Sequence, residues 1–537
     1  MNATPKTPVA TAGTCSLLAM SCIALPWLNP FAVGPSPAVM PWLVALAATA
    51  GLVLLTAIRS LTGAETTGIA RPDHWSPVAA GAWLLAGVMS SCIGLLQYFG
   101  LADALGPWVS QTHVGEAFAN LRQRNQFASL MNIALASLIW WTVSATDKPG
   151  ADVPTHRRRL AWGLLAAVFL AVGNAASSSR TGLVQLLLLG LLCRVWGLWR
   201  LDPVRRLLLA TAVVYGLATL ALPWLAGLDL SVHGLGARLR AGDEPCSSRL
   251  TLWSNVLHLI AQKPWLGWGW GELDYAHYMT LYKGPRFCEI LDNAHNLPLQ
   301  LAVEMGIPVA LLVSGGFVWW VARRRPWREI DPGRQLVWSV LAVILLHSLL
   351  EYPLWYGPFQ MAVLLCAVML WPSQKTPAGK AGIQKNKPES VLGMASRLLI
   401  AITLIAATAY AAWDYRRISQ IYLAPTARDA TYREDTLDKI GDSWLFADQV
   451  RFAELLLTPL ARDNALWTLT TAMSLLHYSP EPRVIEKVIE SAVMLGRDDD
   501  AMAYLARYRA AFPKDYARWA MANAKAPMPS AMNGIAH

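Results

Sequence analysis

Apolar residues run along the chain in blocks of about twenty, separated by polar segments. A helix needs roughly 20 apolar residues to cross the ~30 Å hydrocarbon core of a bilayer, so each block predicts a membrane-spanning helix. The first block ends at Pro26-Trp27-Leu28-Asn29-Pro30 without a small-residue cleavage site, and we interpret it as a retained span. We expect about eleven spans, over 10–28, 38–58, 79–99, 126–145, 160–177, 181–199, 206–227, 297–321, 335–351, 355–371 and 393–413.

The two longest polar segments divide the chain into four parts. We expect seven spans within 1–227, a large loop over 228–296, four spans within 297–413 and a C-terminal domain over 414–537. Apolar residues in the last part recur at helical spacing, as at Val484 and Val488. The stretch Ala501–Tyr516 resembles the end of a tetratricopeptide-like helix pair, which often forms a concave protein-binding surface. The alternative is a small helical cap without a partner.

Composition narrows the class of protein. Only 15% of the 537 residues are charged, whereas a soluble domain carries about 25%. Hydrophobic residues make up 55%, and there are 25 tryptophans. These values exclude a soluble cytosolic enzyme, a disordered chain and a disulfide-rich secreted module. We therefore predict an all-α polytopic membrane protein.

The positive charges predict its orientation. With the N-terminus inside, the basic residues of the short outside loops are only Arg122, Arg124 and Arg180. This asymmetry obeys the positive-inside rule and places both the large loop and the C-terminal domain outside. The net charge of +10 is then a topology signal, and we expect no nucleic-acid partner. The inside gaps hold Arg59, Arg71, Lys148, Arg157–Arg159, Arg200, Arg205, Arg206, Arg323–Arg325, Arg328, Arg334, Lys375, Lys380, Lys385 and Lys387.

Two of the seven cysteines, Cys246 and Cys288, fall in the large loop, and the other five fall in predicted spans. An outside location in an oxidising periplasm predicts that Cys246 and Cys288 form a disulfide. The alternative is two free thiols. We predict no metal site, because no Cys/His spacing suggests zinc and no Asp-x-Asp pair stands in the outside loops.

The unusual polar residues gather at one predicted membrane face. Ionisable side chains at membrane depth are costly, which makes them functional candidates. His347 and Glu351 are four residues apart, so the carboxylate can orient the imidazole and set its tautomer. The full set is Arg122 to Gln126, Ser177 to Arg180, Arg249, His295 with Asn296, and His347 with Glu351 and Tyr352.

Each candidate also has a purely structural interpretation. An arginine at a span end can snorkel to the interface, and a histidine can bond a neighbouring helix. The alternatives are a snorkelling Arg180, a core His347, a Glu351 that bonds the chain break before Pro353, a helix-terminal His295, and lipid-phosphate binding by Arg122 and Arg124.

The residue types nevertheless fit one kind of chemistry. The guanidinium fork of arginine matches phosphate oxygens, and histidine accepts a proton near neutral pH. An isoprenoid-diphosphate sugar presents a diphosphate at this depth. A hydroxyl that attacks its anomeric carbon expels the diphosphate, whose developing charge arginines would stabilise while histidine activates the hydroxyl.

The order of these pieces resembles the bacterial protein O-oligosaccharyltransferases of the PglL type, which are related to O-antigen ligases and polymerases. The resemblance covers roughly residues 20–520. Each motif alone is short, and their order together with the topology is more specific. The matching stretches are Asn120 to Ala128, Ser179 to Gly182, Arg249 with Trp253, Pro264 and Gly267-Trp268-Gly269, His295-Asn296-Leu297 with Gln300, Glu304 and Gly306, and His347 to Leu354.

The resemblance implies a GT-C-like transferase that moves a preassembled glycan en bloc from undecaprenyl diphosphate, without metal or cofactor. It implies that His347 is the base and that Arg180 and Arg249 bind the diphosphate. We expect Glu351 or Tyr352 to orient His347, and Arg124 to be a further diphosphate-binding candidate. The remaining candidates on the substrate or acceptor side are Asn125, Gln126 and His295.

The acceptor is open at this stage. Protein-directed members modify Ser or Thr of pilins or other periplasmic proteins, whereas ligases modify lipid A core. The C-terminal domain and the Arg122–Ala128 stretch resemble the protein-directed branch. We therefore expect an inner-membrane, periplasm-facing oligosaccharyltransferase among membrane lipids. The alternatives are an O-antigen ligase or polymerase, a transporter of lipid-linked glycans, which would tend to show an internal repeat, and a non-catalytic assembly scaffold.

Overall fold

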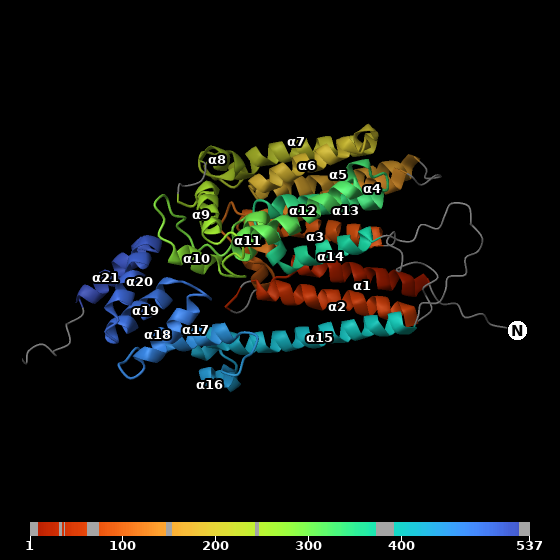
Figure 1. Cartoon of the computed structure of the whole chain (residues 1–537). Coiled ribbons are helices and arrows are strands. Elements are labelled where there is room, and N and C mark those ends of the chain that lie inside the picture. The colour runs from red at the N-terminus through yellow and green to blue at the C-terminus, as the bar shows by residue number, and fades with distance from the viewer. Residues whose placement is uncertain are drawn as a thin grey trace, which may run out of the picture. The chain divides into compact units, whose positions relative to one another are not determined.

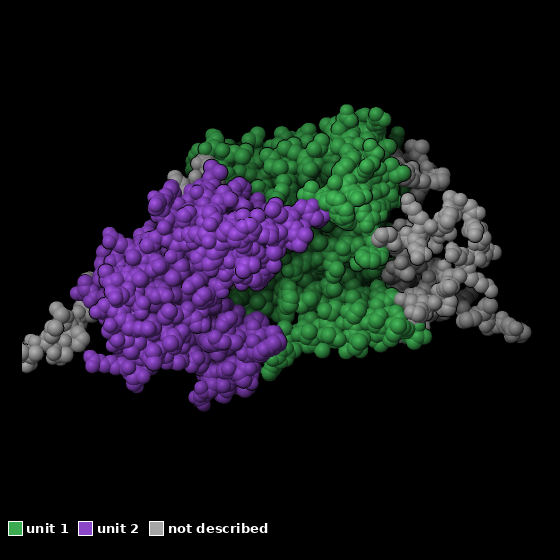
Figure 2. All heavy atoms as spheres, in the orientation of Figure 1, with its two compact units in different colours: residues 1–242, 318–415 green, residues 243–317, 416–537 purple. Residues whose placement is uncertain are grey.

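The computed structural model describes residues 9–31, 35–36, 38–61, 75–146, 153–241, 246–371 and 391–525, and within these ranges it contains helices and no strand (Figure 1). The predicted all-helical fold is confirmed for this part of the chain. The chain divides into two compact units, residues 1–242 with 318–415 and residues 243–317 with 416–537 (Figure 2). Each unit combines two stretches that are far apart in sequence.

The first unit is a bundle of apolar helices. Its 3₁₀ turns include η3 (Ala102–Trp108), η4 (Ala119–Leu121), η5 (Leu198–Arg200), η6 (Pro326–Arg328) and η7 (Pro353–Trp355). Its helices are α1 (Val9–Leu28), α2 (Val39–Leu61), α3 (Trp75–Tyr98), α4 (Arg124–Thr146), α5 (Val153–Ala176), α6 (Arg180–Val195), α7 (Asp202–Leu225), α8 (Gly234–Ala241), α13 (Pro332–Ser348) and α14 (Gly357–Leu370), with the last turns of α12 (Ile307–Arg324) and most of α15 (Val391–Ser419).

Helix α4 is the centre of this bundle. It packs against α3, α5, α6, α7 and α13, and 83% of its most apolar window is buried. Small residues allow the close approach: a Cβ built on Gly87 of α3 would lie 2.3 Å from the Cβ of Ala134 on α4. Such small-residue contacts are typical of packed membrane helices, where van der Waals contact replaces the hydrophobic effect as the driving force.

Six helices in the described part of the chain are long and apolar enough to cross a membrane, as expected of a multi-pass membrane protein. The other predicted spans fall on α1, α6, α13 and α14 and on the segment 297–321, and the total of eleven stays a prediction. Arg71, Lys148, Lys375, Lys380, Lys385 and Lys387, used above for orientation, lie outside the described residues. The six are Val39–Ile58, Trp75–Tyr98, Arg124–Ala145, Arg157–Ala176, Asp202–Leu225 and Val391–Tyr422.

The predicted single helix over 297–321 is wrong. The structure has two helices there, α11 (Leu297–Met305) and α12 (Ile307–Arg324). Gly306 separates them with a φ of +86°, a conformation that glycine adopts readily and that ends a helix. The apolar pattern continues across Gly306, so hydropathy alone does not reveal that the helix is interrupted there.

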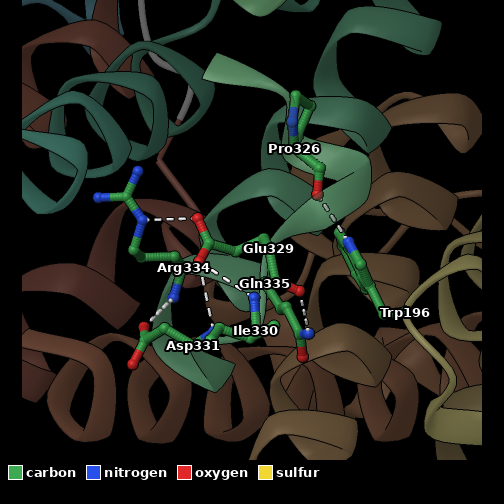
Figure 3. A network of polar contacts seen from close by, with 7 residues as sticks. All are labelled: Trp196, Pro326, Glu329, Ile330, Asp331, Arg334 and Gln335. Carbon is green, nitrogen blue, oxygen red and sulfur yellow. Dashed lines mark hydrogen bonds and ion pairs between the residues drawn. The ribbon is translucent and has the colours of Figure 1, made fainter.

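A polar network holds the turn between α12 and α13 (Figure 3). Asp331 caps α13 by accepting from the Arg334 amide at 2.8 Å. The Glu329 carboxylate accepts from Arg334 Nε at 2.7 Å, and the Trp196 indole donates to the Pro326 carbonyl at 2.7 Å. The bonds among Glu329, Asp331 and Arg334 hold the shape of the turn, and the Trp196–Pro326 bond joins it to the end of α6.

The second unit combines the large loop with the C-terminal domain. It contains the first part of α12 and the last residues of the long α15 (Val391–Ser419). Its other elements are α9 (Arg249–Gln262), α10 (Leu273–Met279), α11, η8 (Gln420–Tyr422), η9 (Pro425–Ala427), η10 (Ala430–Tyr432), α16 (Thr436–Ile440), α17 (Ala447–Leu457), α18 (Ala465–Leu475), α19 (Pro482–Met494), α20 (Asp498–Ala511) and α21 (Pro513–Lys525).

Loop and C-terminal domain share a core within this unit. Tyr278 of α10 is 2% exposed and belongs to the same apolar cluster as Tyr508 of α20. Around this contact the His477 ring stacks on Tyr275, and His477 Nδ1 lies 2.7 Å from Glu272 Oε2. The domain predicted over 414–537 is therefore packed with part of the loop and is not separate from it. Its helices pack in sequence, α17 on α18, α18 on α19, and α19 on α20.

Candidate functional site

The N-terminus of α4 is fixed by the chain that leads into it. Gln97 of α3 is fully buried, and its Oε1 accepts from the Ala119 amide at 2.7 Å, which holds η4. Arg122 then adopts a left-handed φ of +59° and donates to the carbonyls of Pro30 and Phe31. The Arg122 side chain therefore serves to hold this entry, and the residues that follow it begin α4.

Asn125, in the first turn of α4, joins two other predicted motifs. Its Nδ2 donates to Glu351 Oε1 at 3.1 Å, and its Oδ1 accepts from Ser179 Oγ at 2.6 Å. Ser179 Oγ also accepts from the Gly182 amide at 2.9 Å and so caps α6, whose first residue is Arg180. Residues up to 226 positions apart are thus brought into contact within the first unit.

His347, near the end of α13, contacts α4 at Ser129, one helical turn beyond Asn125. Its ring is fully buried, its Nδ1 lies 2.9 Å from Ser129 Oγ, and the Phe359 ring meets it edge-on at 5.6 Å. Glu351 lies just beyond the end of α13 and is 9% exposed; its amide donates to the His347 carbonyl at 2.8 Å. His347 and Glu351 are therefore attached to successive turns of α4, through Ser129 and Asn125.

The bonds around Ser129 favour one tautomer of His347. Gln185 Nε2 donates to Ser129 Oγ at 2.8 Å, and Gln185 Oε1 accepts from Asn132 Nδ2 at 3.2 Å, which orients this amide. The single hydroxyl hydrogen of Ser129 is directed to the Asn125 carbonyl at 2.9 Å. With that hydrogen used, Nδ1–H of His347 donates to Ser129 Oγ, and Nε2 is the accepting nitrogen of the neutral ring.

The other predicted residues of the first unit are sequence neighbours of the cluster residues, but their own contacts differ. Arg180 is half-buried at the start of α6. Arg124 forms an ion pair with Glu116 at 2.7 Å, and Gln126 is 3% exposed within the bundle. Tyr352 is half-buried, and its ring is stacked 6.1 Å from that of Tyr356.

Arg249 and His295 belong to the second unit. Arg249 is the half-buried first residue of α9, which Ser248 caps by accepting from the Thr251 amide. His295 is half-buried and has a left-handed φ of +50°. Such a conformation in a non-glycine residue costs on the order of 1–3 kcal/mol and is frequent at functional sites. His295 also interacts electrostatically with Asp292.

Three side chains fix the turn that carries His295. Asn293 Oδ1 accepts from the His295 amide at 2.9 Å, and Gln300 Oε1 accepts from the Ala294 amide at 2.6 Å. The Trp253 indole donates to the Ala294 carbonyl at 3.1 Å. Asn296 then caps α11. Several residues singled out by the resemblance therefore have a local structural role around His295.

The Pro264–Gly269 motif pairs with the break at Gly306. The Trp268 amide donates to the Val303 carbonyl at 2.8 Å, and the Ile307 amide donates to the Pro264 carbonyl at 2.8 Å. A Cβ on Gly306 would lie 2.1 Å from the Trp265 carbonyl oxygen. The two segments thus lie backbone against backbone, which explains why both carry glycine.

Cys246 and Cys288 form a disulfide with Cα atoms 5.3 Å apart, and the Cys288 amide also donates to the Cys246 carbonyl. The bridge closes the segment that carries α9 and α10. On a chain-entropy model, a loop of this length adds about 2–4 kcal/mol to stability.

A second histidine in the loop has a structural role. His277 lies with Nε2 3.1 Å from the Phe287 carbonyl and Nδ1 2.8 Å from the Tyr282 hydroxyl, so Nε2 carries the hydrogen. Burial, together with the charge of Arg286, lowers the pKa of His277 to about 3. His277 therefore stays neutral near pH 7 and bonds the loop to itself.

Three residues of the first cluster were missed from the sequence: Ser129, Asn132 and Gln185. Their signal is present, because Asn125, Ser129 and Asn132 follow one another at spacings of four and three within an apolar block. That spacing places them on one face of α4. These three residues of α4 and Gln185 of α6 are all buried or half-buried in the first unit.

These features define the chain as a multi-pass helical membrane protein with a buried polar cluster in its first unit. Three family models match it: "Virulence factor membrane-bound polymerase, C-terminal" over residues 335–527, "O-Antigen ligase" over 165–314 and "Protein glycosylation ligase" over 117–141. Over these stretches the chain is similar to protein glycosylation ligases and to O-antigen ligases.

Two curated relatives come from Acinetobacter baylyi (strain ATCC 33305 / BD413 / ADP1). The "ComP-specific O-oligosaccharyltransferase" is 26% identical over 288 residues, which is 53% of this chain and 49% of the relative. The "General O-oligosaccharyltransferase" is 23% identical over 291 residues, 51% of this chain and 47% of the relative. The chain thus spans about half the length of the curated relatives it matches.

Proposed function

We propose that this protein transfers a preassembled glycan en bloc from undecaprenyl diphosphate to Ser or Thr hydroxyls of periplasmic proteins such as pilins. The observation that carries the proposal is the buried cluster of the first unit. There the Asn125 stretch, the Ser179-Arg180 motif and the His347–Glu351 motif converge through direct hydrogen bonds. The names of the two relatives support protein as the acceptor class.

In the proposed reaction the acceptor oxygen attacks the anomeric carbon of the lipid-linked glycan. The bond between that carbon and the diphosphate oxygen breaks, and undecaprenyl diphosphate leaves with the bonding electrons. The hydroxyl proton passes to His347 Nε2. Arg180 and Arg249, with Arg124, bind the diphosphate and stabilise its added charge. Asn125 and Gln126 contribute to the substrate side, and the anomeric configuration inverts in this single displacement.

His295 is the alternative base. His347 is fully buried, so it must be uncovered before an acceptor hydroxyl can reach it, whereas His295 is half-exposed on a strained turn. A general base has to come within hydrogen-bond reach of the proton that it takes. The two histidines lie in different units, so separate substitutions distinguish them.

The test is transfer in vitro, with purified full-length protein, a lipid-linked glycan donor and a pilin peptide acceptor. We expect His347→Ala to lower the transfer rate by about 10²–10⁴-fold, the usual contribution of a general base. His113→Ala is the matched control, because His113 is exposed and outside the cluster. Wild-type transfer by His347→Ala combined with loss of transfer by His295→Ala would move the base to His295. Activity in both variants would reject histidine-assisted transfer.

The family matches also favour a second function, since one model describes O-antigen ligases. In that case the same donor chemistry would serve lipid A core, or a growing polysaccharide, as acceptor. Supplying the pilin peptide and lipid A core in parallel reactions distinguishes them. Glycan on the peptide supports the protein acceptor, and glycan only on the lipid supports the ligase. Mass spectrometry of periplasmic glycoproteins from cells with and without the chain tests the same point in vivo.

A further inference from the structure

A cavity of about 550 Å³ lies among α3, α4 and α5 in the first unit. Pro77, Ala80, Gly81 and Leu84 of α3 form one wall, and the last turns of α4 form another. The α4 wall contains two indoles, Trp140 and Trp141, and two hydroxyl residues, Ser137 and Ser144; Arg159 of α5 completes the lining. Cavities that bind small molecules are commonly 300–1,000 Å³.

This cavity is separate from the histidine cluster. It is lined by the first turns of α3 and α5 and the last turns of α4, whereas Asn125 and Ser129 lie in the first turns of α4. Ser129 and Ser144 are fifteen residues apart, which is about 22 Å along a helix. The cavity therefore lies toward the opposite end of α4, where the charge pattern predicts the cytoplasmic membrane surface.

The lining combines two kinds of chemistry. Most of it is apolar or aromatic, which suits a hydrocarbon chain, and indoles are favoured at the membrane interface. Arg159 is half-buried, the neighbouring Arg157 and Arg158 are exposed, and none of the described residues that line the cavity is acidic. A guanidinium fork pairs with phosphate oxygens. A mostly apolar lining with one arginine matches an amphipathic molecule that has a hydrocarbon chain and an anionic head group.

We propose that this cavity binds an anionic phospholipid of the surrounding bilayer. Its phosphate pairs with Arg159, and one acyl chain lies between the α3 wall and the indole of Trp140. The lipid is an intramembrane ligand of the bundle that also contains the histidine cluster. This inference goes beyond the proposed transferase function and does not depend on it.

Native mass spectrometry of the full-length protein in a zwitterionic detergent tests the site, with phosphatidylglycerol and phosphatidylcholine as probes. We expect one phosphatidylglycerol to be retained in preference to phosphatidylcholine. Arg159→Gln should weaken that binding about tenfold, because a charge-assisted contact is lost. Arg158→Gln is the matched control: it removes the same charge from the adjacent exposed position, and it should change the affinity less than twofold.

A second variant tests the cavity itself. Ser144→Phe fills the cavity without changing charge and should also abolish retention of the lipid. The melting temperature of each variant checks that the bundle is folded. Equal losses in Arg158→Gln and Arg159→Gln would show general attraction to a basic surface and overturn the site. Equal binding of the two lipids, or unchanged binding by a folded Ser144→Phe, would overturn it as well.

Discussion

At the scale of single residues, Ser129 is the contact that sets the chemistry proposed for His347. Its hydroxyl accepts from Gln185 and lies 2.9 Å from the Asn125 carbonyl, an arrangement that favours accepting from the imidazole. An imidazole with its hydrogen on Nδ1 has its lone pair on Nε2, which is the atom needed to take a proton. Ser129 is in this sense a positioning residue that acts through His347.

Ser129→Ala should therefore lower kcat about 10–100-fold, a part of the usual 10²–10⁴-fold effect of a general base. KM for the donor should change little. The profile of kcat against pH should shift, because the histidine loses the partner that stabilises one tautomer, and Ser129→Thr should restore much of the rate. Ser339→Ala is the control: that hydroxyl is also buried but bonds only its own helix, at the Gln335 carbonyl. An unshifted pH profile in Ser129→Ala would contradict the assignment.

Asp274 of α10 gives a prediction for pH. Burial, with the nearby carboxylates of Asp292 and Glu272, raises the pKa of Asp274 to about 7. The ordinary value in an unfolded chain is about 3.9. The folded state therefore holds this proton more tightly, and stability falls as the pH rises from about 4 to about 7.

Asp274→Asn should remove this loss. Its Oδ1 can still accept from the Tyr275 amide, as Asp274 Oδ1 does at 2.7 Å. We expect the variant to melt above the wild type at pH 8 and at about the same temperature near pH 4, where the loss has barely begun, measured by thermal unfolding of the full chain in detergent. Asp499→Asn, at an exposed position of α20, should leave both temperatures unchanged. A variant that melts lower at both pH values would contradict the prediction.

At the scale of elements, the junction of α11 and α12 depends on glycine. A side chain at Gly306 meets two penalties: a backbone with φ of 86° and ψ of 161° is essentially restricted to glycine and costs another residue about 1–3 kcal/mol, and the Cβ would overlap the Trp265 carbonyl. Gly306→Ala should thus lower the melting temperature of the full chain. Gly316→Ala, in the middle of α12, is the matched control, because a Cβ there meets nothing within 4 Å. That change should be neutral or stabilising by about 0.5–1 kcal/mol. Equal melting of the two variants would argue against the junction.

Some elements were predicted from the sequence and others were not. Periodicity and block length located the helices of the first unit, since a buried helix in a bundle has to be apolar along its length. The break at Gly306 was not predicted, because hydropathy does not register one left-handed residue. Asn125, His347 and Glu351 were identified as candidates, but the bonds between them depend on tertiary packing over more than 200 residues. The same limit applies to Gln185, which a sequence pattern cannot pair with Ser129.

At the scale of the whole molecule, orientation is the prediction with the widest consequences. In a background that lacks the five free cysteines but keeps the Cys246–Cys288 bridge, Asp499→Cys in α20 should react with a membrane-impermeant maleimide added to spheroplasts. Arg328→Cys, in the turn between α12 and α13, should react only after the membrane is permeabilised. Both positions are exposed, so reactivity reports the side of the membrane. The reverse pattern would contradict an outside C-terminal domain, and with it a periplasmic site.

The second unit is discontinuous in sequence, and this matters during synthesis. Tyr278 is made well before Tyr508, its partner in the core. At roughly 5–20 residues per second, a nascent chain needs on the order of ten seconds or more to supply the missing half. During that interval α10 presents an unfinished apolar face. The Cys246–Cys288 bridge, whose two cysteines both precede the C-terminal domain, can close in that interval and hold the early half in shape until the late half arrives.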